Sequence, residues 1–346
     1  MALCRLGKMR DLNQPGNALG FLMADLRIFC DAQFRDEALQ LLLDGIAPHL
    51  LIAPQQQGKS VLSVAPPDAE IEQADIALGQ PSVDSVLKAK RLRWLQVTSA
   101  GYTRYDTPEF RAEAASRGLV VTNSSSVYEE ACAEHVLAFM LAQARQLPWA
   151  LRSRHAAGAI AWDELRNASA CLLNQEVVIL GFGTIAARLV EMLAPFKMKI
   201  TVMRRQPRGN ETISTVTKEN LDGPLATADH VVNILPDNSD SIRFITKARL
   251  EQMKQGAIFY NIGRGRTVDQ DALAESLRAN HLAAAWLDVT DPEPLPEGHP
   301  LLALPNCFIT PHTAGGHHKE AETLVRHFLG NFQRFVQHKP LSNRIM

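Results

Sequence analysis

Short β-rich runs alternate with longer helical stretches in the first third of the chain, from Asp25 onward. The runs lie at 26–30, 51–53, 76–78, 94–98 and 119–122, and the stretches with helical character lie at 34–43, 83–90 and 109–117. Strands that alternate with helices are typical of a parallel sheet, because each helix carries the chain back to the same edge. This pattern predicts a first α/β domain.

A second series of apolar runs starts after residue 175. Its members lie at 176–180, 199–203, 230–235, 257–261, 284–289 and 308–310, again separated by helical stretches. Six parallel strands are typical of a nucleotide-binding sheet. The chain is therefore predicted to be α/β, with two Rossmann-like doubly wound parallel-sheet domains.

Two long helices are expected to join these domains. The helix predicted at 128–147 is apolar on every side between residues 136 and 142, which indicates burial all round and suits a linker or dimer helix. The helix predicted at 319–336 follows the last strand and can return the chain to the first domain. We therefore predict a discontinuous substrate domain (24–125 and 316–346), a cofactor domain (126–315) and an N-terminal extension (1–23).

Length, composition and charge narrow the class of protein. The 346 residues suit about two domains, and 46% hydrophobic with 21% charged residues is ordinary for a globular protein. With 36 basic and 37 acidic residues, the chain lacks a net positive field for nucleic acid. No run approaches the roughly 18 apolar residues of a membrane span. Five cysteines without a CxxC pair predict a reduced, cytoplasmic chain without a metal site.

A glycine-rich turn follows the strand predicted at 176–180. The order Gly181-Phe182-Gly183-Thr184-Ile185-Ala186 places G-x-G-x-x-A between this strand and a helix. Gly181 permits the tight turn, Gly183 lets the backbone approach a pyrophosphate, and Ala186 allows close packing at the helix N-terminus. We predict a dinucleotide site that includes Thr184 and Ile185; the alternative is a strand-to-helix turn without a ligand.

Arginines stand where an acidic residue would bind the ribose of NAD. The next strand ends in Met203-Arg204-Arg205-Gln206-Pro207-Arg208. A guanidinium group pairs with a phosphate through two hydrogen bonds, so Arg204 and Arg205 favour NADP(H), with NAD(H) possible; solvated surface charge is the alternative. Further cofactor contacts are predicted near the ends of later strands, at Leu235, Pro236, Ile262, Gly263, Asp288 and Ala314.

Three segments with chemistry-bearing side chains also follow predicted strands of the second domain. They contain Arg264 (Asn261-Ile262-Gly263-Arg264-Gly265), Glu293 (Asp288-Val289-Thr290-Asp291-Pro292-Glu293-Pro294) and His312 (Thr310-Pro311-His312-Thr313-Ala314-Gly315). Ligands bind at the carboxyl ends of strands in open α/β sheets. A fixed cation can hold a carboxylate, a carboxylate can pair with an imidazole, and an imidazole can supply a proton. Together these groups suit the reduction of a ketone.

These motifs resemble the D-isomer-specific 2-hydroxyacid dehydrogenase family, and the resemblance runs from Asp25 to the C-terminus. NIGRG, DVTDPEP and TPHTAG look like the family's Arg, Glu and His segments and follow the glycine turn in the same order. The run RQPR at 205–208 and the segment DVTDPEPLP look most like NADPH-dependent glyoxylate/hydroxypyruvate reductases. The resemblance implies a flavodoxin-like substrate domain, a Rossmann cofactor domain and a homodimer.

The same resemblance implies a mechanism. Nicotinamide would deliver hydride to the carbonyl carbon of a small 2-oxo acid, while His312, kept charged by Glu293, would protonate the carbonyl oxygen. Arg264 would hold the substrate carboxylate and carbonyl. The substrate would also meet the loop of Ser99, Ala100 and Gly101, so substrate-binding residues are expected at Ser99, Ala100, Gly101, Arg264 and His312.

Four other positions bear on function. Thr103 and Arg104 stand where many relatives carry Asp-Asn, and Arg104 is expected to point to solvent; the alternative is a cation at the pocket mouth. Trp162 resembles a position that lends an aromatic side chain to a partner's pocket, although ordinary packing is equally compatible. His135, in a segment similar to the family's Ala-Glu-His, is expected to make structural contacts.

Two readings of function other than this reductase stay open. Transcriptional corepressors resemble the same family and retain much of the same triad, so the motifs also suit a nucleotide-sensing binding protein. A D-2-hydroxyacid dehydrogenase with another substrate is the second alternative. The physiological direction of the reaction is not contained in the motifs.

Overall fold

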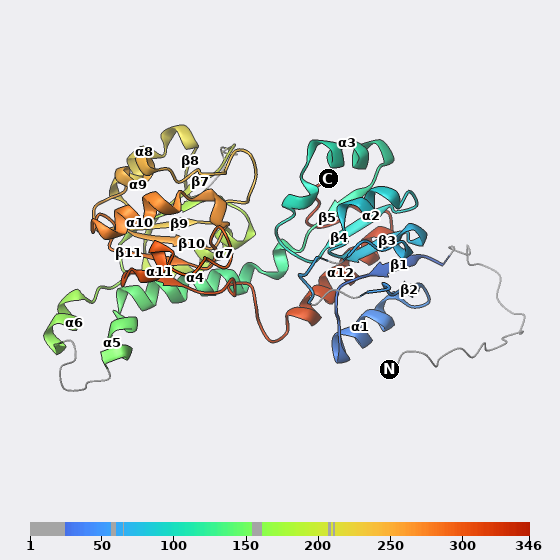
Figure 1. The fold of residues 1–346 in the computed structure, drawn as a ribbon, viewed down its shortest axis with the longest axis horizontal. Helices are drawn as coiled ribbons and strands as arrows, with labels where there is room; N and C mark the ends of the chain where they lie inside the picture. The colour runs from blue at the N-terminus through green and yellow to red at the C-terminus, as the bar shows by residue number, and fades with distance from the viewer. Residues whose placement is uncertain (1–24, 57–59, 65, 154–160, 207–208, 210–211) are drawn as a thin grey trace, which may run out of the picture.

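The protein consists of two lobes that lie side by side, each built around one sheet (Figure 1). The computed structural model describes residues 25–346 except 57–59, 65, 154–160, 207–208 and 210–211. The expected N-terminal extension, 1–23, therefore lies outside the described residues.

The first sheet has five parallel strands in the order β2-β1-β3-β4-β5. Its elements are β1 (Arg27–Cys30), β2 (Leu50–Ile52), β3 (Ile76–Gly79), β4 (Trp94–Val97), β5 (Val120–Thr122), α1 (Asp36–Ile46), α2 (Val83–Lys88) and α3 (Pro108–Arg117). All five predicted strands are present, and the order is that of flavodoxin-like sheets. The central strands β3 and β4 are buried along their whole length, which explains their continuous apolar runs.

The second sheet has seven parallel strands in the order β12-β11-β10-β9-β6-β7-β8. Its strands are β6 (Glu176–Leu180), β7 (Lys199–Met203), β8 (Ser214–Val216), β9 (His230–Asn233), β10 (Ile258–Asn261), β11 (Ala284–Leu287) and β12 (Cys307–Ile309). Its helices are α7 (Thr184–Leu193), α8 (Asp222–Thr227), α9 (Lys247–Gln252), α10 (Gln270–Arg278) and α11 (Pro300–Ala303). The strand order changes direction between β6 and β9. Strands β7 and β8 lie on the far side of β6, and β10 to β12 extend beyond β9, as in Rossmann sheets.

The prediction of six strands in this sheet is wrong, because it missed β8. This edge strand is only three residues long, Ser-Thr-Val, and none of its residues is fully buried. It pairs with β7 alone. A segment of three residues, two of them polar, shows no alternation of apolar and polar positions that a sequence analysis could detect.

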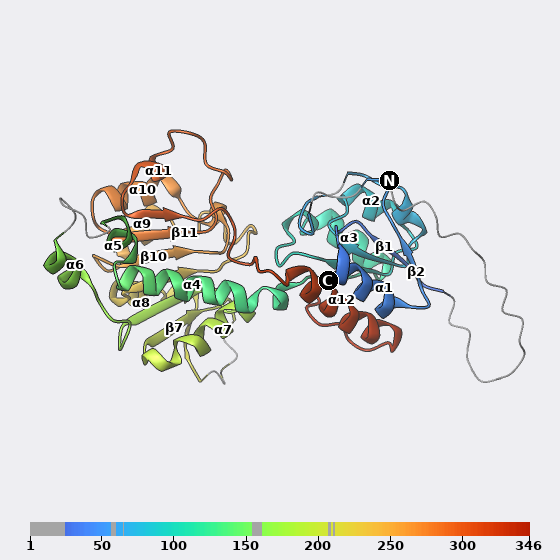
Figure 2. The same cartoon turned by 90° about the horizontal axis from the view of Figure 1, so that it is seen from below.

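Two long helices connect the lobes. Helix α4 (Glu129–Ala144) lies along the second sheet and packs against α7 (Figure 2). Its polar Gln143 is buried but accepts a hydrogen bond from Trp286 Nε1 at 2.9 Å. Helix α12 (Glu320–Val336) packs against α1 in the first lobe, where Phe328 stacks on Trp94 with ring centroids 5.2 Å apart. The exact domain boundaries stay a prediction.

A pair of short helices, α5 (Leu147–Ser153) and α6 (Trp162–Ala168), projects from the second lobe (Figure 1). Trp162 is 66% exposed, and the guanidinium of Arg166 lies 4.5 Å from its ring centroid. The side chain of Trp162 is therefore not part of the hydrophobic core of this chain. Within the described residues, no helix combines the length and the apolar character needed to cross a membrane.

Candidate functional site

The glycine-rich turn forms an open cradle at the start of α7. Gly181 has φ +95°, and a Cβ there would lie 3.2 Å from the Ile234 carbonyl oxygen, so the turn needs glycine. A Cβ on Gly183 would have no neighbour within 4 Å, so the backbone is bare at this point. Gly183 caps α7 without a side-chain hydrogen bond, which leaves the first N–H groups of the helix to a ligand. These features fit a pyrophosphate.

A groove of about 1080 Å³ extends from this cradle along the carboxyl ends of the second sheet. It is lined by eight of the predicted cofactor residues: Gly181, Gly183, Thr184, Ile185, Arg204, Arg205, Leu235 and Pro236. Lys218 and Glu219 line it as well, and sequence reasoning missed them because it missed β8, which precedes them. The size and the residues of the groove fit a dinucleotide.

The end of the groove nearest β7 is charged and exposed. Arg205 Nη2 lies 3.2 Å from Asp240 Oδ2, with the two side chains 75% and 69% exposed. Such a solvated ion pair contributes little, so a ligand phosphate can replace Asp240 as the partner of Arg205. The guanidinium of Arg204 lies 5.9 Å from the ring centroid of Phe182.

Arg264 lies in a small cavity where the two lobes meet. The cavity, about 120 Å³, is lined from the first lobe by Ala100, Gly101, Tyr102, Thr103 and Asp106, and from the second by Ile185, Ile234, Leu235, Pro236, Asp237, Asn238, Ile262, Gly263 and Arg264. Burial lowers the pKa of the Arg264 guanidinium, an effect that the Asp237 carboxylate opposes. Arg264 Nη1 donates to the Gly263 carbonyl at 2.6 Å. A Cβ on Gly101 would lie 2.0 Å from Arg264 Nη2, so only glycine leaves room for this guanidinium.

The three segments that were predicted to carry Arg264, Glu293 and His312 to the site converge at the carboxyl edge of the second sheet. A Cβ on Gly265 would lie 2.0 Å from the Thr290 carbonyl carbon, so the Arg264 loop touches the segment that carries Glu293. His312 Nδ1 lies 2.6 Å from Glu293 Oε1, and both side chains are partly exposed. With Nδ1 paired, Nε2 is the nitrogen that can exchange a proton with a ligand. His312 and Glu293 do not line the cavity around Arg264.

The backbone of His312 is strained. Its φ of +52° lies in the left-handed region, which is uncommon for residues other than glycine. Its N–H donates to the carbonyl oxygens of Asp288 at 2.9 Å and Thr310 at 3.0 Å, which hold the turn in place. Strained residues held in this way cluster at functional sites.

Asp288 anchors the loop that carries His312. Its Oδ1 accepts from Thr310 Oγ1 at 2.6 Å and from the Thr313 N–H at 2.8 Å, and its Oδ2 accepts from the Ala314 N–H at 2.9 Å. Asp288 and Ala314 are buried and do not line the groove, so their predicted cofactor contact stays a prediction. His135 Nε2 lies 3.3 Å from Thr310 Oγ1, a structural contact of the kind expected.

The loop after β4 presents its backbone to the cavity. Ala100 and Gly101 line the cavity, whereas Ser99 turns inward and donates through Oγ to the Gly101 carbonyl at 2.5 Å. Gln80, which is 2% exposed, donates through Nε2 to Ser99 Oγ at 2.9 Å and to Thr98 Oγ1 at 3.1 Å. Sequence reasoning missed Gln80, because no motif surrounds it.

The two positions that depart from the family pattern behave differently. Thr103 Oγ1 donates to the carbonyl oxygen of Asp237 at 3.1 Å and so joins the two lobes. Arg104 Nη1 is buried and has no hydrogen-bond partner among the residues that the structure describes, so the expectation that the Arg104 guanidinium points to solvent is wrong for this nitrogen. Arg104 does not line the cavity around Arg264 either, whereas Asp237 and Asp106 do.

Comparison with known proteins decides the family. Residues 137–314 match the model of the D-isomer specific 2-hydroxyacid dehydrogenase, NAD binding domain. The chain belongs to this family.

Two mammalian members of the dehydrogenase family are similar in sequence. The chain is 34% identical over 214 residues to the glyoxylate reductase/hydroxypyruvate reductase of Mus musculus, which covers 61% of this chain and 65% of that protein. It is 31% identical over 236 residues to the Homo sapiens protein of the same name, covering 67% and 72%. The match thus spans slightly less than two thirds of the mouse protein and somewhat more of the human one.

The fold agrees with solved structures of the family. The D-isomer specific 2-hydroxyacid dehydrogenase from Xanthobacter autotrophicus Py2, solved in complex with NADPH and MES, superposes with a TM-score of 0.75 at 25% identity. The superposition covers 93% of this chain and 98% of that chain. Two parallel-sheet α/β lobes, as predicted, are therefore confirmed.

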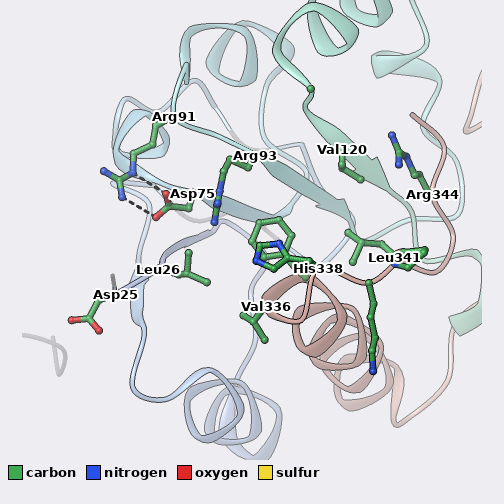
Figure 3. A pocket seen from close by; sticks show the side chains of 14 residues that line it. Asp25, Leu26, Asp75, Arg91, Arg93, Val120, Val336, His338, Leu341 and Arg344 are labelled. Carbon is green, nitrogen blue, oxygen red and sulfur yellow. Dashed lines mark hydrogen bonds and ion pairs between the residues drawn. The ribbon is translucent and has the colours of Figure 1, made fainter. Parts of the chain in front are cut away.

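A second hollow lies at the opposite edge of the first sheet, and it lacks the motif residues (Figure 3). Arg91 there pairs with Asp75 through two hydrogen bonds of 3.0 and 3.1 Å. The guanidinium of Arg93 covers the Phe335 ring at 4.9 Å, and Arg344 Nε donates to the Met346 carbonyl at 2.8 Å. Because these cations already have intramolecular contacts, the candidate site is the groove and cavity between the lobes.

Proposed function

We propose that this chain is an NADP-preferring D-2-hydroxyacid dehydrogenase that reduces a small 2-oxo acid of the glyoxylate or hydroxypyruvate type. The observation that carries the proposal is the 2.6 Å pair of His312 and Glu293 on a loop system that also holds the partly buried Arg264. An acid paired with a carboxylate beside a fixed cation is what ketone reduction requires. The dinucleotide groove next to this system supports the same conclusion.

Each protein group has a task in the proposed reaction. A bound nicotinamide supplies the hydride. Arg264 binds the substrate carboxylate and orients the carbonyl, and its burial strengthens this contact because water does not screen it. His312 donates a proton from Nε2 to the carbonyl oxygen, while Glu293 holds Nδ1 and stabilises the charged imidazole. Ala100 and Gly101 supply a bare backbone surface against which the substrate packs.

The preference for NADP(H) is part of the proposal. Arg205 and Lys218 line the groove, and Arg205 forms an ion pair with the exposed Asp240. A 2′-phosphate gives these cations a stronger partner than a ribose hydroxyl does. The relative from Xanthobacter autotrophicus Py2, solved with NADPH, supports this preference.

The assembly and the compartment are also part of the proposal. Leu151 and Trp162, 71% and 66% exposed on the projecting helices α5 and α6, present apolar surface that suits a homodimer. Cys30, Cys132, Cys171 and Cys307 are all unpaired, as is typical of a reducing cytoplasmic compartment. Cys132 is buried in the core.

The test follows the absorbance of NADPH and, separately, of NADH on mixing with hydroxypyruvate, glyoxylate, pyruvate and 2-oxoglutarate at neutral pH. We expect rapid oxidation of NADPH with hydroxypyruvate or glyoxylate and slower oxidation of NADH. If the protein binds NADPH tightly but oxidises it with none of the four acids, the reductase proposal is wrong and the nucleotide-sensing function takes its place. Faster oxidation of NADH would overturn the cofactor preference alone.

A further inference from the structure

Asp237 places a carboxylate in the same cavity as Arg264. It follows β9, its side chain is 11% exposed, and it lines the cavity between the lobes. Its Oδ2 accepts a hydrogen bond from Arg266 Nη1 at 3.3 Å. Its Oδ1 is buried without any hydrogen-bond partner in the described part of the chain. A buried carboxylate oxygen without a partner calls for an explanation.

The loop that carries Asp237 is held from both sides. Asn238 donates through its N–H to Ser241 Oγ at 3.0 Å, and this hydroxyl in turn donates to the Pro236 carbonyl. From the other lobe, Thr103 Oγ1 donates to the Asp237 carbonyl at 3.1 Å. The carboxylate is therefore fixed in place beside the loop that forms the other wall of the cavity.

The charges that line the cavity leave Asp237 as its dominant acid. Three charged residues line the cavity: Arg264, Asp237 and Asp106. Asp106 is paired with Arg111 Nε at 2.5 Å, a closer contact than the 3.3 Å between Asp237 and Arg266, so the charge of Asp106 is offset more fully. Asp237 is the largest opposing charge on Arg264. A monoanionic substrate can pair with Arg264, whereas a second carboxylate would lie in the field of Asp237 in a site that water screens poorly.

We propose that Asp237 sets the charge class of the substrate, so that the site accepts 2-oxo acids with one carboxylate and excludes those with two. This inference rests on the proposed reductase function. The proposed discrimination works through repulsion of the disfavoured substrate, which is one of the two ways in which a protein separates similar ligands.

The test compares substrates that differ in charge, with saturating NADPH. Values of kcat/KM are measured for pyruvate and hydroxypyruvate, which carry one carboxylate, and for oxaloacetate and 2-oxoglutarate, which carry two. In the Asp237→Asn variant, which keeps an oxygen for Arg266, we expect the ratio of dicarboxylate to monocarboxylate kcat/KM to rise about tenfold or more. Where oxaloacetate turnover is undetectable, the inhibition constants of malonate and glycolate supply the same ratio.

Two further variants separate this role from a structural one. Arg266→Gln removes the partner of Asp237 and leaves its charge less compensated, so the ratio should fall by about threefold, opposite in sign to Asp237→Asn. Asp106→Asn removes an acid of the same cavity that is already paired, so the ratio should stay within about twofold.

Three results would overturn the inference. The first is an equal loss of kcat/KM for all four acids in Asp237→Asn. The second is a rise of the dicarboxylate-to-monocarboxylate ratio in Asp106→Asn equal to that in Asp237→Asn. The third is a rise of this ratio in Arg266→Gln. Should Asp237→Asn fail to fold, the sign of the change in Arg266→Gln decides. Failure of the proposed function looks different, because the unmodified protein would then reduce none of the acids.

Discussion

The two sheets present their carboxyl edges to the site in contrasting ways. The second sheet supplies charged side chains, Arg264 and His312, which are held by hydrogen bonds to the backbone and to Glu293. The first sheet supplies a bare backbone at Ala100 and Gly101, with buried polar side chains such as Gln80 behind it.

The contrast means that the second sheet contributes chemical groups to the site, whereas the first sheet contributes its shape. On the edge of the second sheet, each functional group can be exchanged for another of similar size, and a change there tests a chemical role. On the edge of the first sheet, added atoms displace the side chains that lie opposite, so a substitution there tests steric fit. The two kinds of variant should therefore differ in their effects on kcat and KM.

The largest effect is expected on the edge that supplies the chemistry. His312→Asn removes the proposed proton donor and should lower kcat by about 10² to 10⁴, the usual contribution of general acid catalysis. Glu293→Gln should lower kcat as well, because an amide stabilises the charged imidazole less than a carboxylate 2.6 Å away. Steady-state rates with hydroxypyruvate and NADPH measure both effects. His317→Asn, a change in a neighbouring histidine without a proposed role, is the control, and an equal loss in that variant would contradict the assignment.

The second effect tests the fit of the first sheet's edge. Gly101→Ala adds a methyl group 2.0 Å from Arg264 Nη2, so the partly buried guanidinium must move. A displacement of this size costs about 10² in kcat/KM. The control is Gly330→Ala in α12, where the added methyl group meets nothing within 4 Å and kcat/KM should not change. Activity of Gly101→Ala within about threefold of the parent would show that Arg264 has room to shift.

A smaller effect is expected at the exposed, β7 end of the groove. Arg205→Ala should raise the KM for NADPH by about tenfold and change the KM for NADH by less than about twofold, because only NADPH carries the 2′-phosphate. Asp240→Asn removes the present partner of Arg205 and should lower the KM for NADPH. Equal effects on the two cofactors would rule out a phosphate contact at Arg205.

Local patterns account for what the sequence could predict. The five strands of the first sheet, the cradle of Gly181 and Gly183 and the loops of Arg264, Glu293 and His312 each depend on a few consecutive residues. The pairing of Glu293 with His312 followed from a resemblance to a family, and the structure shows it at 2.6 Å.

Contacts between distant segments could not be predicted in this way. Thr103 and Asp237 are 134 positions apart and meet only because two sheets face each other. Gln80 and Asp237 belong to no motif, and their roles depend on the loops opposite them. Arg104 was expected in solvent because exposed arginines are common, yet its Nη1 is enclosed by the fold.

A further effect concerns stability rather than catalysis, and it comes from an acid buried beneath the first sheet's edge. Burial raises the pKa of Asp31 to about 7, although the Gln80 N–H and Arg104 oppose this rise. Because the folded value lies above the unfolded one, Asp31 contributes its full stability below about pH 4 and loses it as the pH rises through about 7. At about 1.4 kcal/mol per pKa unit, the loss is of order 1 to 4 kcal/mol.

Asp31→Asn removes this titration while keeping an oxygen for the Gln80 N–H, which lies 2.8 Å from Asp31 Oδ1. We therefore expect Asp31→Asn to have a higher midpoint of thermal unfolding than the parent at pH 8 and a smaller difference at pH 5, where only part of the loss has occurred. The exposed Asp44→Asn in α1 is the control and should show no such dependence on pH. A parent and an Asp31→Asn variant that lose stability in parallel between pH 5 and pH 8 would mean that Asp31 is ionised in the folded protein, held by Arg104 rather than by a proton.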